Sequence, residues 1–319
     1  MREPDFWRRG GSLWPATALL PAAAIYAAAV RLRGWGRAPY RPPVPVVVAG
    51  GLTLGGAGKT PLALALAEKL SPRNPHFLSR GYGGRARGPL RVDPARHDAA
   101  EVGDEPLLLA AAAATWIARD RAAGAKAAVD DGAGLLILDD GFQNPFVAKD
   151  LSVLAIDGES GLGNGHVFPA GPLREPAERA LRRAGAVVLI GSDGAGVAAC
   201  IGGRCPILAA RLAATNAAAV AGARVYAFAG IGRPEKFFAS LEDAGALVVS
   251  RRAFADHHPY TAAEAAALVS AAKAAGAVPI TTAKDRQRLP SSFHDRIRTF
   301  EVRLEFEDPA AVAALLSRL

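Results

Sequence analysis

A glycine-rich segment with the sequence TLGGAGKT contains the residue types best suited to chemistry. Glycines let backbone N–H groups turn toward phosphate oxygens, Lys59 can reach the β- and γ-phosphates of a nucleoside triphosphate, and Thr60 can hold Mg²⁺. The generic pattern has glycine where this chain has Thr53. We nevertheless predict a nucleotide-binding loop formed by Thr53, Leu54, Gly55, Gly56, Ala57, Gly58, Lys59 and Thr60.

The segments on either side give this loop the setting that it needs. An apolar, valine-rich run at residues 44–49 predicts a strand, and the leucine- and alanine-rich residues 61–70 predict a helix. A glycine-rich turn without a ligand is the alternative, but strand, loop and helix in this order favour a phosphate site. The loop alone does not separate a kinase from a hydrolase, a ligase or a switch protein.

Carboxylates at element ends are the second group of candidates. The apolar run from Leu135 ends in Asp139 and Asp140, the Walker B pattern, which places a carboxylate beside the phosphate loop to hold Mg²⁺ directly or through water. Asp104 and Glu105 begin an apolar helix, where capping would explain one of them and a base or metal role stays open for the pair.

Other candidates lie in loops. His257 follows an aspartate and precedes a predicted helix; a lone loop histidine is usually structural, but this pair offers a carboxylate and a titratable ring. Arg80 and Tyr82 lie in a glycine-rich segment that faces either an anion or solvent. Arg174 lies in the long loop 161–175, and loops of this length usually serve a site.

The N-terminal region has an uncharged run from Leu13 to Val30, followed closely by arginines. Pro15 and Pro21 interrupt this run, which is rich in alanine and slightly short for spanning a bilayer. We predict a helix in the membrane interface, with aromatic residues at the headgroup level: Trp7, Trp14, Tyr26 and Trp35. A buried helix and a signal peptide are the alternatives; export would separate the nucleotide site from ATP.

Composition sets the remaining limits. The 319 residues suit an α/β protein with a P-loop NTPase-like core, a mostly parallel sheet and a smaller second lobe, and we expect divisions at 1–36, 37–205 and 206–319. The net charge of +8 fits nucleic acid, an anionic membrane or an anionic substrate, and nucleic acid is the weakest because no lysine-rich block occurs. Two cysteines without further ligands predict free thiols.

Several motifs in a fixed order resemble those of the tetraacyldisaccharide 4′-kinase family. Beside the phosphate loop they are LSRGYG, VGDEP, LDDGFQ, PAGPLRE, AGIGRP and FADHH, and Thr53 agrees with this family. The resemblance implies ATP- and Mg²⁺-dependent phosphorylation of the 4′-hydroxyl of tetraacyldisaccharide 1-phosphate, giving lipid IVA. It also implies a membrane-associated helix at the cytoplasmic face of a Gram-negative inner membrane, with no obligate protein partner.

The resemblance further implies roles for individual residues. Lys59 and Thr60 would serve the phosphates and Mg²⁺, with Asp139 and Asp140 completing the metal site. Asp104 would be the base that takes the sugar proton, His257 its partner, and phosphate or sugar would be held by Arg80, Tyr82 and Arg174. Ala283 stands where the family tends to have glutamate, which leaves the roles of Lys284 and Asp285 open.

Three rival interpretations remain. A soluble P-loop kinase of small molecules would need no membrane helix. A membrane-associated regulatory ATPase would have a lysine where this chain has Leu54. A GTPase switch is disfavoured because the sequence Ala283–Lys284–Asp285 lacks the spacing that recognises guanine.

Overall fold

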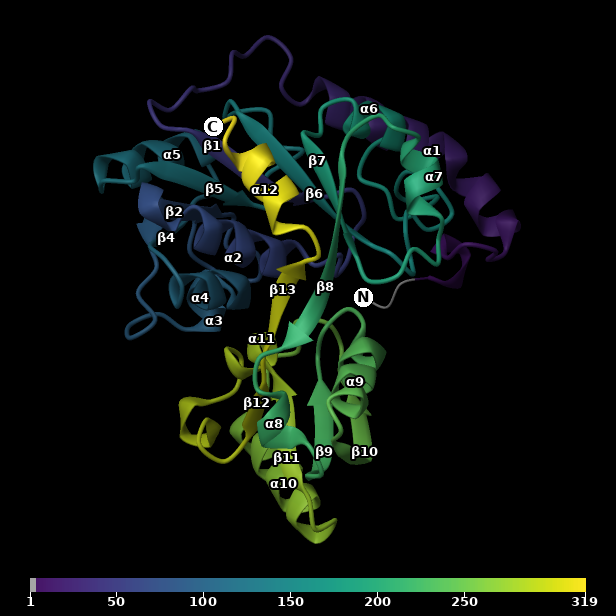
Figure 1. The fold of residues 1–319 in the computed structure, drawn as a ribbon, viewed down its shortest axis with the longest axis vertical. Coiled ribbons are helices and arrows are strands. Elements are labelled where there is room, and N and C mark those ends of the chain that lie inside the picture. Colours follow the sequence, from purple (N-terminus) through teal and green to yellow (C-terminus); the bar gives the residue numbers. More distant parts are fainter. Residues whose placement is uncertain (1–3) are drawn as a thin grey trace.

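A computed structural model describes residues 4–319 as two lobes, each built on its own sheet (Figure 1). The larger sheet has nine strands, and its pairs are parallel except at the two edges, β13–β8 and β3–β4. Its spatial order is β13 (Val302–Phe306), β8 (Ile207–Ala214), β7 (Ala186–Ile190), β6 (Leu151–Asp157), β1 (Val46–Gly51), β5 (Leu135–Asp139), β2 (Pro75–Ser79), β4 (Thr115–Ile117) and β3 (Leu90–Arg91).

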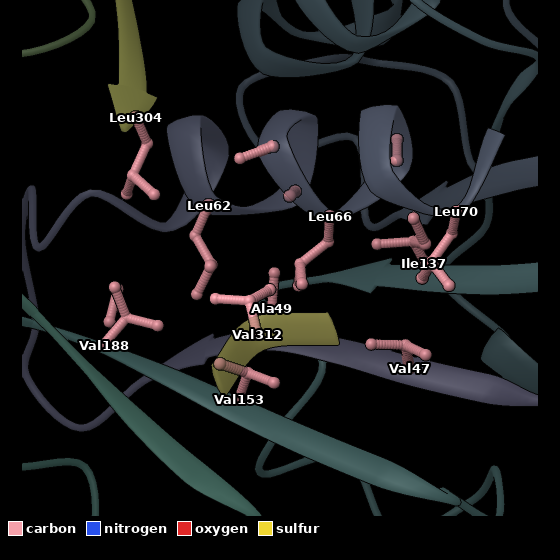
Figure 2. Packing of buried hydrophobic residues seen from close by; sticks show 14 of the residues in the cluster. Val47, Ala49, Leu62, Leu66, Leu70, Ile137, Val153, Val188, Leu304 and Val312 are labelled. Atoms are coloured by element: carbon pink, nitrogen blue, oxygen red, sulfur yellow. The ribbon is translucent and has the colours of Figure 1, made fainter. Parts of the chain in front are cut away.

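The central strands are hydrophobic throughout because both faces of the sheet are covered. All six residues of β1 are buried, and alternate residues enter opposite cores. On one face Val47 and Ala49 pack with Leu62 and Leu66 of helix α2 (Lys59–Lys69), as Figure 2 shows. Burial of each such leucine contributes about 1.5–3 kcal/mol. This packing fixes α2, and with it the loop that enters α2, against the sheet.

Further helices of the larger lobe connect these strands. Each is short, and most follow the strand-then-helix alternation of a parallel sheet. Their bounds are α3 (Ala99–Val102), α4 (Asp104–Ala110), α5 (Arg121–Asp130), α6 (Ala177–Leu181) and α7 (Val197–Ile201), with 3-10 turns η2 (Ser71–Arg73) and, in the other lobe, η3 (Ser291–Phe293).

The smaller lobe has a four-stranded, fully parallel sheet. Its strand order is β10 (Leu247–Ala253), β9 (Arg224–Ala229), β11 (Val278–Thr282) and β12 (Arg298–Phe300), and its helices are α8 (Ala217–Val220), α9 (Pro234–Asp243), α10 (Ala262–Ala274) and α11 (Ala283–Arg286). Helix α10 begins with a capping box between Thr261 and Glu264. The α/β character predicted for this lobe is confirmed.

The larger sheet extends past residue 205, where the sequence suggested a division. Strand β8 pairs in parallel with β7, and β13 returns antiparallel to β8, so these two strands run together between the lobes (Figure 1). The last helix, α12 (Pro309–Leu316), also packs in the core of the larger sheet through Val312 and Leu315. The expected boundary therefore does not coincide with the boundary between the sheets, because β8, β13 and α12 bury their apolar residues in the larger core.

The N-terminal helix, α1 (Leu13–Leu32), lies on the outside of the larger lobe (Figure 1). Within residues 4–319 it is the one helix long and apolar enough to cross a membrane, and Trp14, Ile25 and Trp35 in and after it are 77%, 72% and 85% exposed. This exposure excludes the alternative that residues 13–30 form a buried helix. Trp7, expected at the membrane surface, is instead buried in the 3-10 turn η1 (Asp5–Trp7), where its indole N–H donates to Pro169 O.

Candidate active site between the lobes

The glycine-rich loop leaves β1 and enters α2 as predicted. Gly55 and Gly58 have φ angles of 111° and 84°, and a Cβ at Gly58 would overlap Ile190, so both positions favour glycine. Lys59 begins α2, its Nζ donates to Gly55 O over 3.1 Å, and Thr60 follows it in the first turn. The positive end of the helix and the lysine thus face the space that phosphates would fill.

Loop 161–175 holds the glycine-rich loop from the other side. Leu54 N donates to Pro172 O and Arg174 N donates to Leu52 O, both over 2.8 Å, and Thr53 forms a bridge with Leu173. At Thr53 the chain is thus paired like a short strand. The same long loop also receives Trp7, so it links the N-terminal segment to the phosphate loop.

Asp140 lies directly after β5 and is engaged by two cations. Arg174 donates to both of its carboxylate oxygens, over 2.9 and 2.8 Å, and Lys59 Nζ lies 4.0 Å from Oδ2. Burial alone would raise the pKa of Asp140, but Lys59 and Arg174 hold it below its ordinary value. Arg174, expected to hold phosphate or sugar, is therefore bound to this carboxylate.

Asp139 is the more suitable of the two aspartates for a cation. Its side chain is buried and its Oδ1 lacks a hydrogen-bond partner. Burial and the charges of Glu105 and Asp140 raise its pKa to about 8. A buried carboxylate with a free oxygen is the kind of ligand that Mg²⁺ takes, so the site fits the predicted metal.

No group of three or more His, Cys, Asp or Glu residues that could hold a metal ion occurs within residues 4–319. This is compatible with a Mg²⁺ ion that arrives with a nucleotide, because such ions take only one or two carboxylates and complete their shell with phosphates and waters. The candidates for holding it are Asp139, whose buried Oδ1 lacks a partner, and Thr60, which lies in the first turn of α2.

Asp104 and His257 meet across the two lobes. His257 Nδ1 lies 3.0 Å from Asp104 Oδ2, and Glu105 N donates to Asp104 Oδ1 over 2.9 Å. Burial would raise the pKa of Asp104, but the hydrogen bond from His257 and the charges of Lys284 and Arg288 hold it below its ordinary value of 3.8. His257 has a φ of 57°, a conformation that non-glycine residues rarely adopt and that is often found at functional sites.

Further cations of the smaller lobe surround this pair. Lys284 Nζ donates to Glu105 Oε1 over 3.0 Å and lies 3.5 Å from His257 Nε2, and Arg288 Nε lies 3.1 Å from Asp104 Oδ2. Although burial disfavours its charge, Glu105 and Asp104 raise the pKa of Lys284. The sequence left the role of Lys284 open. In the structure Lys284 joins the two lobes through its contact with Glu105.

The glycine-rich segment after β2 borders the same space. The ring of Tyr82 lies 5.2 Å from that of His257 and is 64% exposed, and Arg80 is also exposed. Arg121, which the sequence did not single out, is buried close to the strand-end aspartates. Burial, opposed by Asp139 and Asp140, lowers its pKa to about 10. Arg80 and Tyr82 are thus accessible to a ligand, whereas Arg121 is buried.

A second charged contact joins the lobes through Asp157. Asp157, at the end of β6, lies 2.5 Å from Lys236 Nζ and 3.1 Å from Arg233 Nη1. A Cβ added to Gly232 would lie 3.7 Å from the backbone N of Gly56, so the smaller lobe reaches over the phosphate loop. No short-range sequence signal indicates these two partners of Asp157, because both come from the other lobe.

The fold and the phosphate loop are those of a P-loop nucleotide-binding protein. The defining features are a parallel sheet, a glycine-rich loop after β1, a lysine on the following helix and aspartates at the end of the adjacent strand. The model of the family described as LpxK, tetraacyldisaccharide-1-P 4′-kinase, matches residues 15–319. The chain belongs to this family, which confirms the resemblance inferred from the motifs.

Individual relatives agree with this assignment. Tetraacyldisaccharide 4′-kinases of Rhodospirillum centenum and Gluconacetobacter diazotrophicus are 55% and 52% identical to the chain, covering 100% and 99% of it and 97% of each relative. The crystal structure of LpxK from Aquifex aeolicus in complex with ATP superposes with a TM-score of 0.76 at 26% identity, covering 95% of this chain and 99% of that one. The predicted fold class, kinase activity and use of ATP are confirmed.

Proposed function

We propose that the protein transfers the γ-phosphate of ATP to the 4′-hydroxyl of tetraacyldisaccharide 1-phosphate, giving lipid IVA in lipid A biosynthesis. The observation that supports this most strongly is the Asp104–His257 pair at the junction of the lobes, where Gly232 of the smaller lobe approaches both Asp256 and Gly56 of the phosphate loop. A nucleotidase that uses water needs no such pair from a second lobe, whereas a kinase must bring an acceptor hydroxyl to the phosphate. Membership of the kinase family agrees with this arrangement.

On the nucleotide side, phosphoryl transfer depends on positioning and on neutralising charge rather than on covalent help. In our proposal the backbone of residues 53–58 and Lys59 bind the β- and γ-phosphates. Thr60 and Asp139 would hold Mg²⁺, which when bound neutralises phosphate charge. Asp140, expected as a second metal ligand, is assigned to Lys59 and Arg174 because both of its oxygens accept hydrogen bonds from Arg174.

On the acceptor side, the Asp104–His257 pair takes the proton of the sugar hydroxyl. We retain Asp104 as the base and His257 as its partner, since the two share one hydrogen bond and Asp104 stays ionised. A positioned base of this kind contributes about 10²–10⁴-fold to the rate. Arg80 and Tyr82, accessible at the same side of the site, are assigned to the anionic sugar head.

We also infer that the protein works at a membrane surface, as a peripheral or monotopic protein on the cytoplasmic face of the inner membrane. The support is α1, whose exposed Trp14 and Ile25 and following arginines suit the headgroup region. The acyl chains of the substrate could then stay in the bilayer while its head enters the site. The expected absence of nucleic acid and of an obligate protein partner remains a prediction.

The acceptor class can be tested directly. The wild-type protein is incubated with ATP and either tetraacyldisaccharide 1-phosphate in detergent micelles or water-soluble glucosamine 1-phosphate, and the phosphorylated products are identified by mass spectrometry. We expect a product only from the lipid. Faster phosphorylation of the soluble sugar would contradict the proposal and favour the soluble small-molecule kinase.

A further inference from the structure

Arg288 is a buried cation of the smaller lobe that faces a carboxylate of the larger lobe. It follows α11, which packs against α4 at the junction of the lobes (Figure 1). Its side chain is 6% exposed, and its Nε lies 3.1 Å from Asp104 Oδ2. The Nε–H is not aligned as a hydrogen bond, so the contact is an ion pair. A buried charge so close to the proposed base needs an explanation, because burying an ion is costly unless it is paired.

The guanidinium of Arg288 is immobilised by its own lobe. Nη1 donates to His258 O over 3.1 Å, and Nη2 donates to Gly230 O over 2.9 Å and to Asp285 Oδ1 over 2.8 Å. Asp285 is itself fully buried and accepts hydrogen bonds from Tyr260 Oη and from Gly230 N, each over 2.9 Å. Arg288 therefore presents a fixed positive charge to Asp104 rather than a mobile one.

The same hydrogen bonds hold the backbone around His257. His257 N donates to Gly230 O over 3.0 Å, the carbonyl that also accepts from Arg288. The carbonyl of the next residue, His258, is the other backbone acceptor of Arg288. Because His257 has a φ of 57°, its conformation needs support from its surroundings. Arg288 thus contacts both the backbone that holds the His257 ring in place and Asp104, the carboxylate that this ring binds.

We propose that Arg288, itself held by Asp285, is a positioning residue that aligns the Asp104–His257 pair across the two lobes. This inference rests on the proposed function, in which that pair takes the acceptor proton. Arg288 does not contact the substrate in this account; it orients Asp104 and supports the loop of His257. It also gives Asp285, whose role the sequence left open, a function in fixing Arg288.

A purely structural role makes a different prediction. If Arg288 served only to hold the lobes together, its loss would weaken ATP binding and lower the unfolding temperature, and its effect on turnover would be the same with or without Asp104. If it acts through Asp104, its effect on turnover should largely disappear once Asp104 is removed, because residues that act as a unit are not additive. A double-mutant cycle separates these cases.

The experiment compares Arg288→Met, Asp104→Ala and the double variant with wild type, measuring kcat, KM for the lipid, ATP affinity and unfolding temperature. Arg286→Met is the matched control, because Arg286 lies on α11 and donates to His294 O over 2.7 Å, away from the pair. We expect Arg288→Met to lower kcat by roughly 10–100-fold, as loss of an orienting partner does. In the Asp104→Ala background it should cost less than about 3-fold, with Arg286→Met near wild type.

The outcomes are distinguishable. Additive losses in the cycle, or equal losses for Arg288→Met and Arg286→Met, would overturn the role of Arg288 while leaving the kinase assignment intact. Absence of transfer by the wild type would overturn the proposed function and this inference with it. If Arg288→Met does not fold, Arg288→Lys is used in the same cycle, because it keeps the charge but not the three hydrogen bonds of the guanidinium. A non-additive loss supports the proposal, and an additive loss contradicts it.

Discussion

Asp104 of the larger lobe and His257 of the smaller lobe are separated by 152 intervening residues, yet their side chains share a hydrogen bond of 3.0 Å. The pair therefore forms only when the two lobes are in contact. In the proposed mechanism the phosphate loop and the strand-end aspartates of the larger lobe bind the nucleotide, whereas the acceptor is served by the Asp104–His257 pair, to which both lobes contribute. This division makes separate losses of ATP binding and of turnover measurable.

Replacing Asp104 by alanine should separate the two activities. Because the side-chain partners of this carboxylate, His257 and Arg288, belong to the smaller lobe and not to the phosphate loop, we expect kcat to fall by roughly 10²–10⁴-fold while ATP affinity stays near wild type. Steady-state kinetics and equilibrium ATP binding check this. Asp243→Ala, an exposed carboxylate at the end of α9, is the control. Parallel losses of turnover and ATP binding would remove Asp104 from the role of base.

Replacing His257 by alanine should have a smaller effect on turnover than replacing Asp104. The carboxylate would keep its charge partners Lys284 and Arg288, so part of the base function would survive. We expect a loss of kcat between those of wild type and Asp104→Ala, measured in the same assay. Kinetics identical to wild type would show that the histidine is structural only.

Stability at acid pH should depend on Asp104. Burial opposes the ionisation of Asp104, but His257, Lys284 and Arg288 lower its folded-state pKa below 3.8. The contribution of Asp104 to stability is therefore full above pH 3.8 and is lost as the pH falls through the folded-state pKa. The difference in unfolding free energy between wild type and Asp104→Asn, measured in urea from about pH 6 to about pH 3, should stay constant down to about pH 5 and shrink as the pH falls below 3.8. A difference constant over this range would contradict the assignment.

Membrane association should depend on the exposed face of α1. We expect the triple change of Trp14, Ile25 and Trp35 to serine to shift the protein from the membrane pellet to the supernatant in vesicle sedimentation, because these side chains are exposed and apolar. The matched control changes three exposed apolar residues of β8 and β10: Leu212, Leu247 and Val249. Equal sedimentation of the two triple variants would exclude this helix as the membrane contact.

Much of the fold was predictable because the signals are local. The buried runs that became β1, β5, β6 and β7 are continuous and hydrophobic, as expected for strands covered on both faces, and TLGGAGKT stands between a strand and a helix as predicted. The assignment of β8 to a sheet was not predictable. Nothing within Ile207–Ala214 indicates that it pairs with β7 rather than with a strand of the smaller lobe.

In the site, too, the contacts that depend on local sequence patterns were predictable, and those between distant segments were not. Lys59, Asp139 and Asp140 come together because parallel strands end at one edge of the sheet, which the sequence pattern predicts. The binding of Arg174 to Asp140, and the burial of Trp7 against loop 161–175, depend on contacts between distant segments. Arg288 has no motif of its own around it, and only its position in three dimensions shows that it faces Asp104.

The most direct test of the whole account is transfer of labelled phosphate from ATP to tetraacyldisaccharide 1-phosphate in detergent micelles, comparing wild type with Lys59→Ala. Lys59 is the phosphate-loop cation nearest Asp140, so its loss removes charge neutralisation at the transferred group. We expect a labelled lipid with wild type and none with the variant. Near-normal transfer by Lys59→Ala, or no labelled lipid from wild-type protein that binds ATP, would contradict this expectation.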